Sequence, residues 1–152
     1  MAITAKARAR LQLRADTRLG VITTLGIVKV AAGAVKGGGA SLLTSGLKNI
    51  GAQVNVDGEA QNRLQLTITS GKRLIRLCSL SAEARTENGH THLRVGGLEW
   101  YRTNQPRLFY VIPAGPKSIA GMDPYKRFLE AVRQGVLEED PSALVTVATP
   151  EA

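Results

Sequence analysis

Two histidines have the spacing that a metal site on a strand would need. His90 and His92 are the only histidines in the chain, and a strand would place both on one side because its side chains alternate. Glu99 follows nearby, but its spacing from the pair is too long and no third histidine exists. We therefore interpret the histidines as exposed residues beside a hairpin turn, and we predict no metal ligand.

The remaining reactive residues do not form a catalytic motif. Lys36 precedes Gly37–Gly39, whereas the lysine of a phosphate-binding loop follows its glycines, so we interpret this run as a hinge. Cys78 shares the strand parity of Leu80 and Ala82, which predicts a buried, unreactive thiol. Carboxylates are few, and no pair has a spacing that signals acid–base catalysis. The sequence predicts no catalytic residue and no cofactor, and it favours a protein that is not an enzyme.

The chain carries 20 basic and 12 acidic residues, a net charge of +8. This charge would attract nucleic acid, an anionic membrane or an acidic protein partner, although an arginine-rich composition also raises the charge without any partner. Six arginines are candidates for one anion-binding surface on an outer sheet face: Arg8, Arg10, Arg14, Arg63, Arg73 and Arg76. Four aromatic residues would stack on bases if exposed, and would line a core or cavity if buried: Trp100, Tyr101, Phe109 and Tyr110.

Length and composition fit one ordinary globular domain. A chain of 152 residues with 43% hydrophobic residues can bury a single core. Its one cysteine rules out an internal disulfide and fits a reducing compartment, so we expect a cytoplasmic protein. The apolar run at 21–36 is too short to span a membrane, and we predict no transmembrane segment.

An antiparallel meander is predicted between Asn62 and Ile112. Leu64, Leu66 and Ile68 alternate with polar residues, as in a half-buried strand. Asn88-Gly89 is the dipeptide that a type I′ hairpin turn prefers. Besides one long strand between the turns at 70–72 and 87–90, strands are expected over residues 53–56, 62–70, 93–101 and 108–112.

Two irregularities predict bends in this meander. The alternation of apolar residues changes parity near Leu77-Cys78, which indicates a β-bulge. Gly96-Gly97 inside the next strand indicates a second bulge or a sharp bend. Bends in neighbouring long strands are typical of a strongly curved sheet.

The segments before the meander predict one strand and two helices. Residues 3–17 alternate between apolar and polar or basic side chains, which favours a strand with a basic outer face, although a basic helix is the alternative. Residues 21–36 and 40–50 have helical spacing on either side of the glycine hinge. Many β-branched residues leave a strand open for 21–36.

The C-terminal part predicts the most regular helix of the chain. Asp123 is expected at the N-cap and Pro124 at the first helical position. One apolar face follows at helical spacing: Tyr125, Phe128, Leu129, Val132 and Val136. We predict one domain over residues 1–138 and a loose tail over 139–152, with an edge strand at 144–147 as an alternative.

The predicted order is strand, two helices, antiparallel meander and long C-terminal helix. It resembles the helix-grip superfamily, which includes START-like, polyketide-cyclase-like and pollen-allergen-like domains. The predicted fold is therefore α+β, a curved antiparallel sheet packed against a long C-terminal helix, with two short helices after the first strand. The resemblance covers residues 7–137 and rests on this order rather than on a motif.

The resemblance implies an apolar cavity between the sheet and the last helix. The residues expected to line it are Trp100, Tyr110, Tyr125, Phe128, Leu129 and Val132. The first functional hypothesis is thus a non-enzymatic module that binds an apolar small molecule or lipid. The alternative is a basic interaction domain for nucleic acid, anionic membrane or an acidic protein. A cyclase or hydrolase is a third reading, for which the sequence names no residues.

Overall fold

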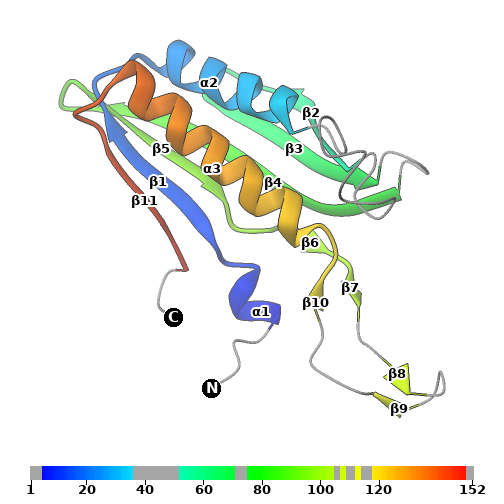
Figure 1. The fold of residues 1–152 in the computed structure, drawn as a ribbon. Helices are drawn as coiled ribbons and strands as arrows, with labels where there is room; N and C mark the ends of the chain where they lie inside the picture. The colour runs from blue at the N-terminus through cyan, green and yellow to red at the C-terminus, as the bar shows by residue number, and fades with distance from the viewer. Residues whose placement is uncertain are drawn as a thin grey trace, which may run out of the picture.

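The computed structural model describes residues 5–35, 52–70, 75–104, 107–108, 112–113 and 118–149. Within these residues the chain is an α+β protein, in which two long helices lie on the same face of a seven-stranded antiparallel sheet (Figure 1). The strands of this sheet are β1 (Gln12–Thr17), β2 (Gln53–Glu59), β3 (Arg63–Ser70), β4 (Ile75–Glu87), β5 (His90–Gly96), β6 (Trp100–Tyr101) and β11 (Leu144–Ala148). Their order is β11-β1-β5-β4-β3-β2, and β6 pairs with β4 beyond the end of β5.

The long helices are α2 (Val21–Ala34) and α3 (Met122–Glu139), and a single turn, α1 (Ala5–Arg8), precedes β1. The helix predicted for residues 21–36 is confirmed as far as Ala34. This segment is helical despite its β-branched residues because its buried side packs on α3 and on the sheet. The second helix, expected at 40–50, lies outside the described residues, as does the glycine hinge before it. Of the helices that the structure describes, none is long and apolar enough to span a membrane.

The first strand is shorter than predicted. Of the alternating residues 3–17, residues 3 and 4 lie outside the described residues, and within 5–17 a strand begins only at Gln12, where Leu13 and Ala15 point into the core and Arg14 points outward. Residues 5–8 form α1, in agreement with the helical alternative. Alanine, lysine and arginine are strong helix formers, and none of the described strands pairs with this segment.

The core lies between the helix-covered face of the sheet and the two long helices. The inward face predicted for β3 is confirmed, since Leu64, Leu66 and Ile68 are fully buried. The apolar face predicted for α3 is also confirmed, and Phe128 and Val132 are among its fully buried members. Burial of each such side chain stabilises the fold by about 1.5–3 kcal/mol before the entropic cost of ordering it.

The predicted hairpin turn and the first predicted bulge are both confirmed. Asn88 and Gly89 have φ angles of 53° and 80°, as both central residues of a type I′ turn require. The β3–β4 register shifts next to Ile68, which faces Cys78, and this shift leaves Leu77 without a partner in β3. The extra residue restores the inward direction of the apolar side chains in β4.

The strand predicted over 93–101 is interrupted at its two glycines. Gly96 and Gly97 have φ angles of 105° and 71°, which residues with a side chain rarely adopt. The hydroxyl of Tyr125 donates a hydrogen bond to the carbonyl of Leu11 and accepts one of 3.1 Å from the N–H of Gly97. A Cβ atom on Gly96 would collide with this hydroxyl. The bend is therefore fixed from the helix side, and burial raises the pKa of Tyr125.

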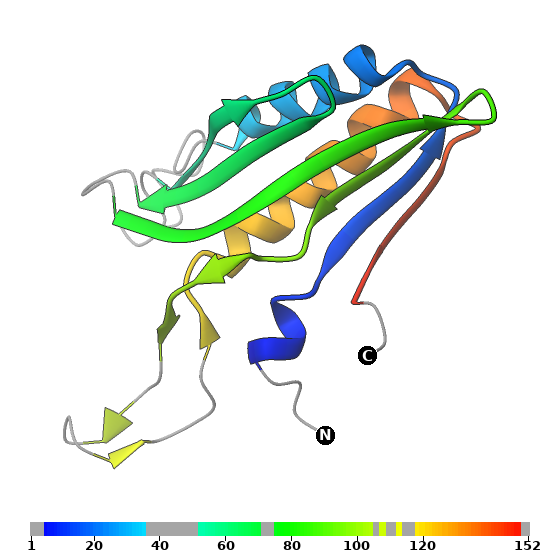
Figure 2. The ribbon, with the colours of Figure 1, turned by 180° about the vertical axis from the view of Figure 1, so that it is seen from behind.

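Beyond β6 the chain leaves the main sheet. Two short pairs follow in the described residues, β7 (Thr103–Asn104) with β10 (Ser118–Ile119) and β8 (Arg107–Leu108) with β9 (Ile112–Pro113). Figure 2 shows that they project away from the sheet. Leu108 and Ile112, the described ends of the strand predicted to close the meander, pair with each other outside the main sheet, so that prediction is wrong. The bend at the paired glycines changes the direction of the chain, and β6 is only two residues long.

The C-terminal part differs from the prediction at both ends of α3. Gly121, with a φ angle of 85°, is the N-cap, and Asp123 lies in the first turn rather than at the cap. A carboxylate in the first turn still interacts favourably with the helix dipole. After α3, residues 144–148 pair with β1 as the edge strand β11, which was the alternative to a loose tail.

Candidate binding face of the sheet

The sheet face opposite α2 and α3 carries none of the described helices (Figure 2). A hollow of about 520 Å³ lies over β11, β1, β5 and β4, and we call it the charged hollow. Its charged lining consists of Arg14, Arg85, Arg94, Asp16, Glu83 and Glu87, with His92 among them. Three guanidinium groups thus stand against three carboxylates, so the hollow is not where the net positive charge of the chain is concentrated.

Cross-strand pairing brings these side chains into rows. Arg14 of β1 faces Arg94 of β5, which faces Glu83 of β4, and Glu83 faces Arg63 of β3. Arg94 and Glu83 form an ion pair of 3.4 Å, and Arg63 pairs with Glu99 at 3.8 Å. These side chains are about half exposed, and exposed pairs of this kind stabilise a fold by only about 0–1 kcal/mol each.

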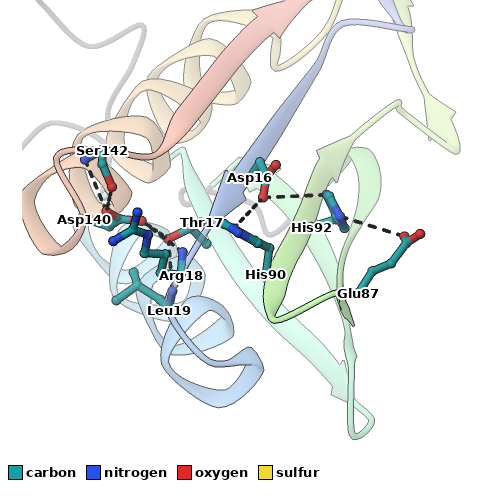
Figure 3. Close-up of polar contacts among 9 residues, drawn as sticks. All are labelled: Asp16, Thr17, Arg18, Leu19, Glu87, His90, His92, Asp140 and Ser142. Carbon is teal, nitrogen blue, oxygen red and sulfur yellow. Dashed lines mark hydrogen bonds and ion pairs between the residues drawn. The ribbon is translucent and has the colours of Figure 1, made fainter.

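The two histidines lie beside carboxylates at the hairpin end of this face (Figure 3). Oδ1 of Asp16 is 3.5 Å from Nδ1 of His90 and 3.9 Å from Nδ1 of His92, whose Nε2 is 3.8 Å from Glu87. These contacts are ion pairs only when the imidazoles are protonated. Oδ1 of Asp16 is shielded from solvent and has no hydrogen-bond partner among the described residues. No group of three or more His, Cys, Asp or Glu side chains in the described part of the chain is arranged to hold a metal ion.

A second constellation lies at the opposite end of β4. Trp100 of β6 faces Ser79 and is 41% exposed. The guanidinium carbon of Arg76 lies 5.4 Å from the centre of the indole ring, and that of Arg102 lies 5.7 Å from it. Nε of Arg102 also donates a hydrogen bond of 2.8 Å to the backbone carbonyl of Arg76. We call Arg76, Trp100 and Arg102 the tryptophan cluster.

The six arginines expected to form one anion surface are only partly brought together. Arg14, Arg63 and Arg76 project from three different strands of the uncovered face. Arg8 belongs to α1 and Arg10 follows it, so neither lies on a strand of the sheet. Arg73 lies outside the described residues. Two arginines that the expected set omitted lie beside its strand members: Arg94 faces Arg14 across β5 and β1, and Arg102 donates a hydrogen bond to the backbone carbonyl of Arg76.

The residues expected to line an apolar cavity are also divided. Tyr125, Phe128, Leu129 and Val132 all face the sheet from α3 and are at most 1% exposed, as part of the core. Trp100 points to the uncovered face instead, because its partner Ser79 lies between the inward-facing Cys78 and Leu80. Tyr110 lies outside the described residues.

Cys78 is placed as its strand parity predicts. Its side chain is fully buried on the helix-covered face of β4. Burial raises the pKa of the Cys78 thiol to about 12, because the thiolate would lose its hydration. The thiol is therefore protonated at neutral pH and is not a nucleophile in the folded protein.

One polar cluster was missed at the sequence level. Asp140, directly after α3, accepts hydrogen bonds from the hydroxyl of Thr17 (2.7 Å), the backbone N–H of Arg18 (3.0 Å) and the hydroxyl of Ser142 (2.6 Å) (Figure 3). These donors, Ser142 foremost, hold the pKa of the carboxyl well below its usual range. The Asp-Pro-Ser sequence at the helix end is a local signal for such a turn, whereas contact with residues 17 and 18 has no local signal.

Comparison with known protein families, curated proteins and solved structures gave no match to this chain.

Proposed function

We propose that this chain is a nucleic-acid-binding domain that holds a single strand on its uncovered sheet face at the tryptophan cluster. The observation that supports it is the exposed Trp100 with guanidinium groups from Arg76 and Arg102 over its ring. An indole face stacks on any base, and a guanidinium group forms paired hydrogen bonds with phosphate. One cluster thus offers both interactions that a nucleotide requires.

The aromatic ring favours nucleic acid over the other anionic partners that a charge of +8 would attract. Tryptophan also takes part in membrane and protein interfaces, but only a base offers a flat π-face that stacks on the indole ring beside a phosphate for the guanidinium groups. Base stacking contributes about 1–3 kcal/mol per base. The surroundings of Trp100 on this face are also small and polar, since Thr67 and Ser79 lie in the same cross-strand row. The neighbouring strands therefore do not crowd the indole, which is 41% exposed beside the two guanidinium groups.

Intrinsic fluorescence tests the proposal directly, because Trp100 is the only tryptophan in the chain. Titration with an unlabelled oligothymidylate should quench the emission, and binding should weaken steeply between roughly 50 and 200 mM salt. The logarithm of the association constant falls linearly with the logarithm of the salt concentration. Arg76→Ala and Arg102→Ala should each make this negative slope shallower by about 0.7, because each removes one phosphate contact. Arg133→Ala is the matched control, because Arg133 lies on α3 and pairs with Glu130.

Two outcomes would overturn the proposal. One is the absence of oligonucleotide binding at the lowest salt concentration. The other is binding that leaves the fluorescence of Trp100 unchanged and that persists in Trp100→Ala. Binding to anionic vesicles or to an acidic protein, without binding to the oligonucleotide, would identify one of those partners instead.

A second candidate is a module that binds an apolar small molecule or lipid between the sheet and α3, as in helix-grip proteins. It is supported by the order of the elements and by the long helix whose apolar side faces the sheet. Native mass spectrometry of the purified protein, together with titration of fatty acids and fluorescent apolar probes, tests it. Failure to find a co-purifying ligand and any uptake of these probes would exclude this candidate.

A further inference from the structure

The two edges of the sheet differ in their protection against pairing with another chain. At the β2 edge, Asp57 and Glu59 carry charge, and the β2–β3 register shifts between Val56 and Gly58. Charges and bulges of this kind prevent edge strands from pairing with other molecules. At the opposite edge, β11 has the sequence Leu-Val-Thr-Val-Ala, without charge, proline, glycine or register shift.

Two apolar side chains of β11 are exposed to solvent. Leu144 is 73% exposed and Val147 is 37% exposed. Val147 faces Leu13 of β1 on the helix-covered side of the sheet, yet α3 does not cover it fully. Among the described residues, β11 has β1 as its only strand partner. As far as the structure describes the chain, its second edge therefore offers backbone donors and acceptors that no other strand uses, beside apolar side chains.

We propose that β11 pairs in antiparallel fashion with β11 of a second copy of this chain, about a twofold axis at Thr146. This register places Thr146 opposite its own counterpart. It also places Val145 opposite the Val147 position of the second copy, and Leu144 opposite the Ala148 position. The strand is thus complementary to itself, because every apolar side chain meets another apolar side chain and no charges meet.

Charge on the neighbouring strand does not oppose this arrangement. Arg14 of β1 is beside Thr146, so the two copies of Arg14 would be separated by three strand spacings, about 14 Å. This separation exceeds the screening length of about 8 Å at physiological ionic strength. Leu144 and Thr146 also line the charged hollow, so the pairing would place two hollows side by side on one continuous sheet.

A charge-swap experiment tests the proposed dimer. The unmodified protein should show a monomer–dimer equilibrium in sedimentation measurements over roughly 1–100 µM, because dimers form by mass action. Thr146→Lys and Thr146→Glu should each weaken dimerisation by up to about fivefold, because like charges would face each other across the axis. An equimolar mixture of the two variants should dimerise again. Thr23→Lys is the control, because Thr23 is an exposed threonine on α2.

Hydrogen exchange on the unmodified protein provides a measurement that does not depend on a variant. Amide protons of residues 144–148 should become more protected as the protein concentration rises. The proposal is overturned if the protein is monomeric throughout the range, or if dimerisation is unchanged in both Thr146 variants. It is equally overturned if Thr23→Lys, rather than the Thr146 variants, abolishes dimerisation, because that result would place the interface on α2.

Discussion

Tyr125 shows how a buried residue on one face of the sheet determines a candidate site on the other. Its hydroxyl connects α3 with the carbonyl of Leu11 and with the N–H of Gly97. These contacts fix the bend after which β6 begins, and β6 carries Trp100. The indole of the tryptophan cluster therefore depends on a contact that lies within the core.

The first prediction concerns the packing of α3 on the sheet. Phe128→Ala should lower the free energy of unfolding by about 3–5 kcal/mol, because it removes a fully buried ring and leaves a cavity. Lys126→Ala, on the exposed side of the same helix, should change it by less than about 0.5 kcal/mol. Chemical denaturation of both variants measures the difference. Equal and negligible losses would contradict the docking of α3 on the sheet.

A smaller decrease in the free energy of unfolding of Phe128→Ala would indicate a ligand cavity beside the ring. If the ring borders a ligand cavity, it makes fewer contacts and its removal costs less than this range. The affinity for an apolar ligand should then change instead. Denaturation with and without such a ligand would separate this result from tight packing.

At the level of elements, Asp140 joins the end of α3 to the connection between β1 and α2. Its carboxylate accepts hydrogen bonds from Ser142, from the backbone of Arg18 and from Thr17. These bonds stabilise the charged form, so the pKa of Asp140 in the folded protein lies below its value in the unfolded chain. The contribution of Asp140 to the free energy of unfolding is therefore fully present above the pKa that this carboxyl has in the unfolded chain. It is lost as the pH falls toward the lower pKa that the carboxyl has in the folded protein.

The second prediction follows from the lowered pKa of Asp140 in the folded protein. Asp140→Asn should unfold more easily than the unmodified protein at pH 7, and the difference should shrink as the pH falls below about 4. The measurement is the free energy of unfolding of both proteins across that pH range. Glu138→Gln, which changes an exposed carboxylate two residues before Asp140, is the control and should show little change. A difference that is constant with pH would show that the carboxylate charge does not matter.

Local patterns predicted the elements that are defined by their own residues. The alternation in β3, the Asn88-Gly89 turn and the apolar face of α3 are confirmed because each depends on spacing within one segment. The short helix α1 and the departure of the chain after β6 were not predicted as such. Both depend on whether a neighbouring strand is available for pairing, and that is a property of the whole sheet.

The candidate site was less predictable than the fold, for the same reason. The row of Arg14, Arg94 and Glu83 requires the register of three strands, and Asp16 meets the histidines only through the pairing of β1 with β5. Trp100 was expected to line a cavity together with residues of α3, and this was wrong. The bend at Gly96-Gly97 changes which side chains after it point to the helix-covered face, so Trp100 points to the uncovered face. A side chain's face can be predicted along an uninterrupted strand, but not across such a bend.

The third prediction tests the whole molecule through its only cysteine. Cys78 lies at the centre of the sheet, between β3 and β6, and its thiol is fully buried. Because burial raises its pKa to about 12, a thiol reagent at pH 8 should label it only when the protein opens. Labelling should therefore be slow in native buffer, and Phe128→Ala should accelerate it about tenfold for each 1.4 kcal/mol of lost stability, provided that opening is global and reclosing is fast. Lys126→Ala should label at the rate of the unmodified protein. Labelling of the unmodified protein at the rate of a free thiol would mean that β4 is open to solvent, and the packing of both long helices on this sheet would have to be rejected.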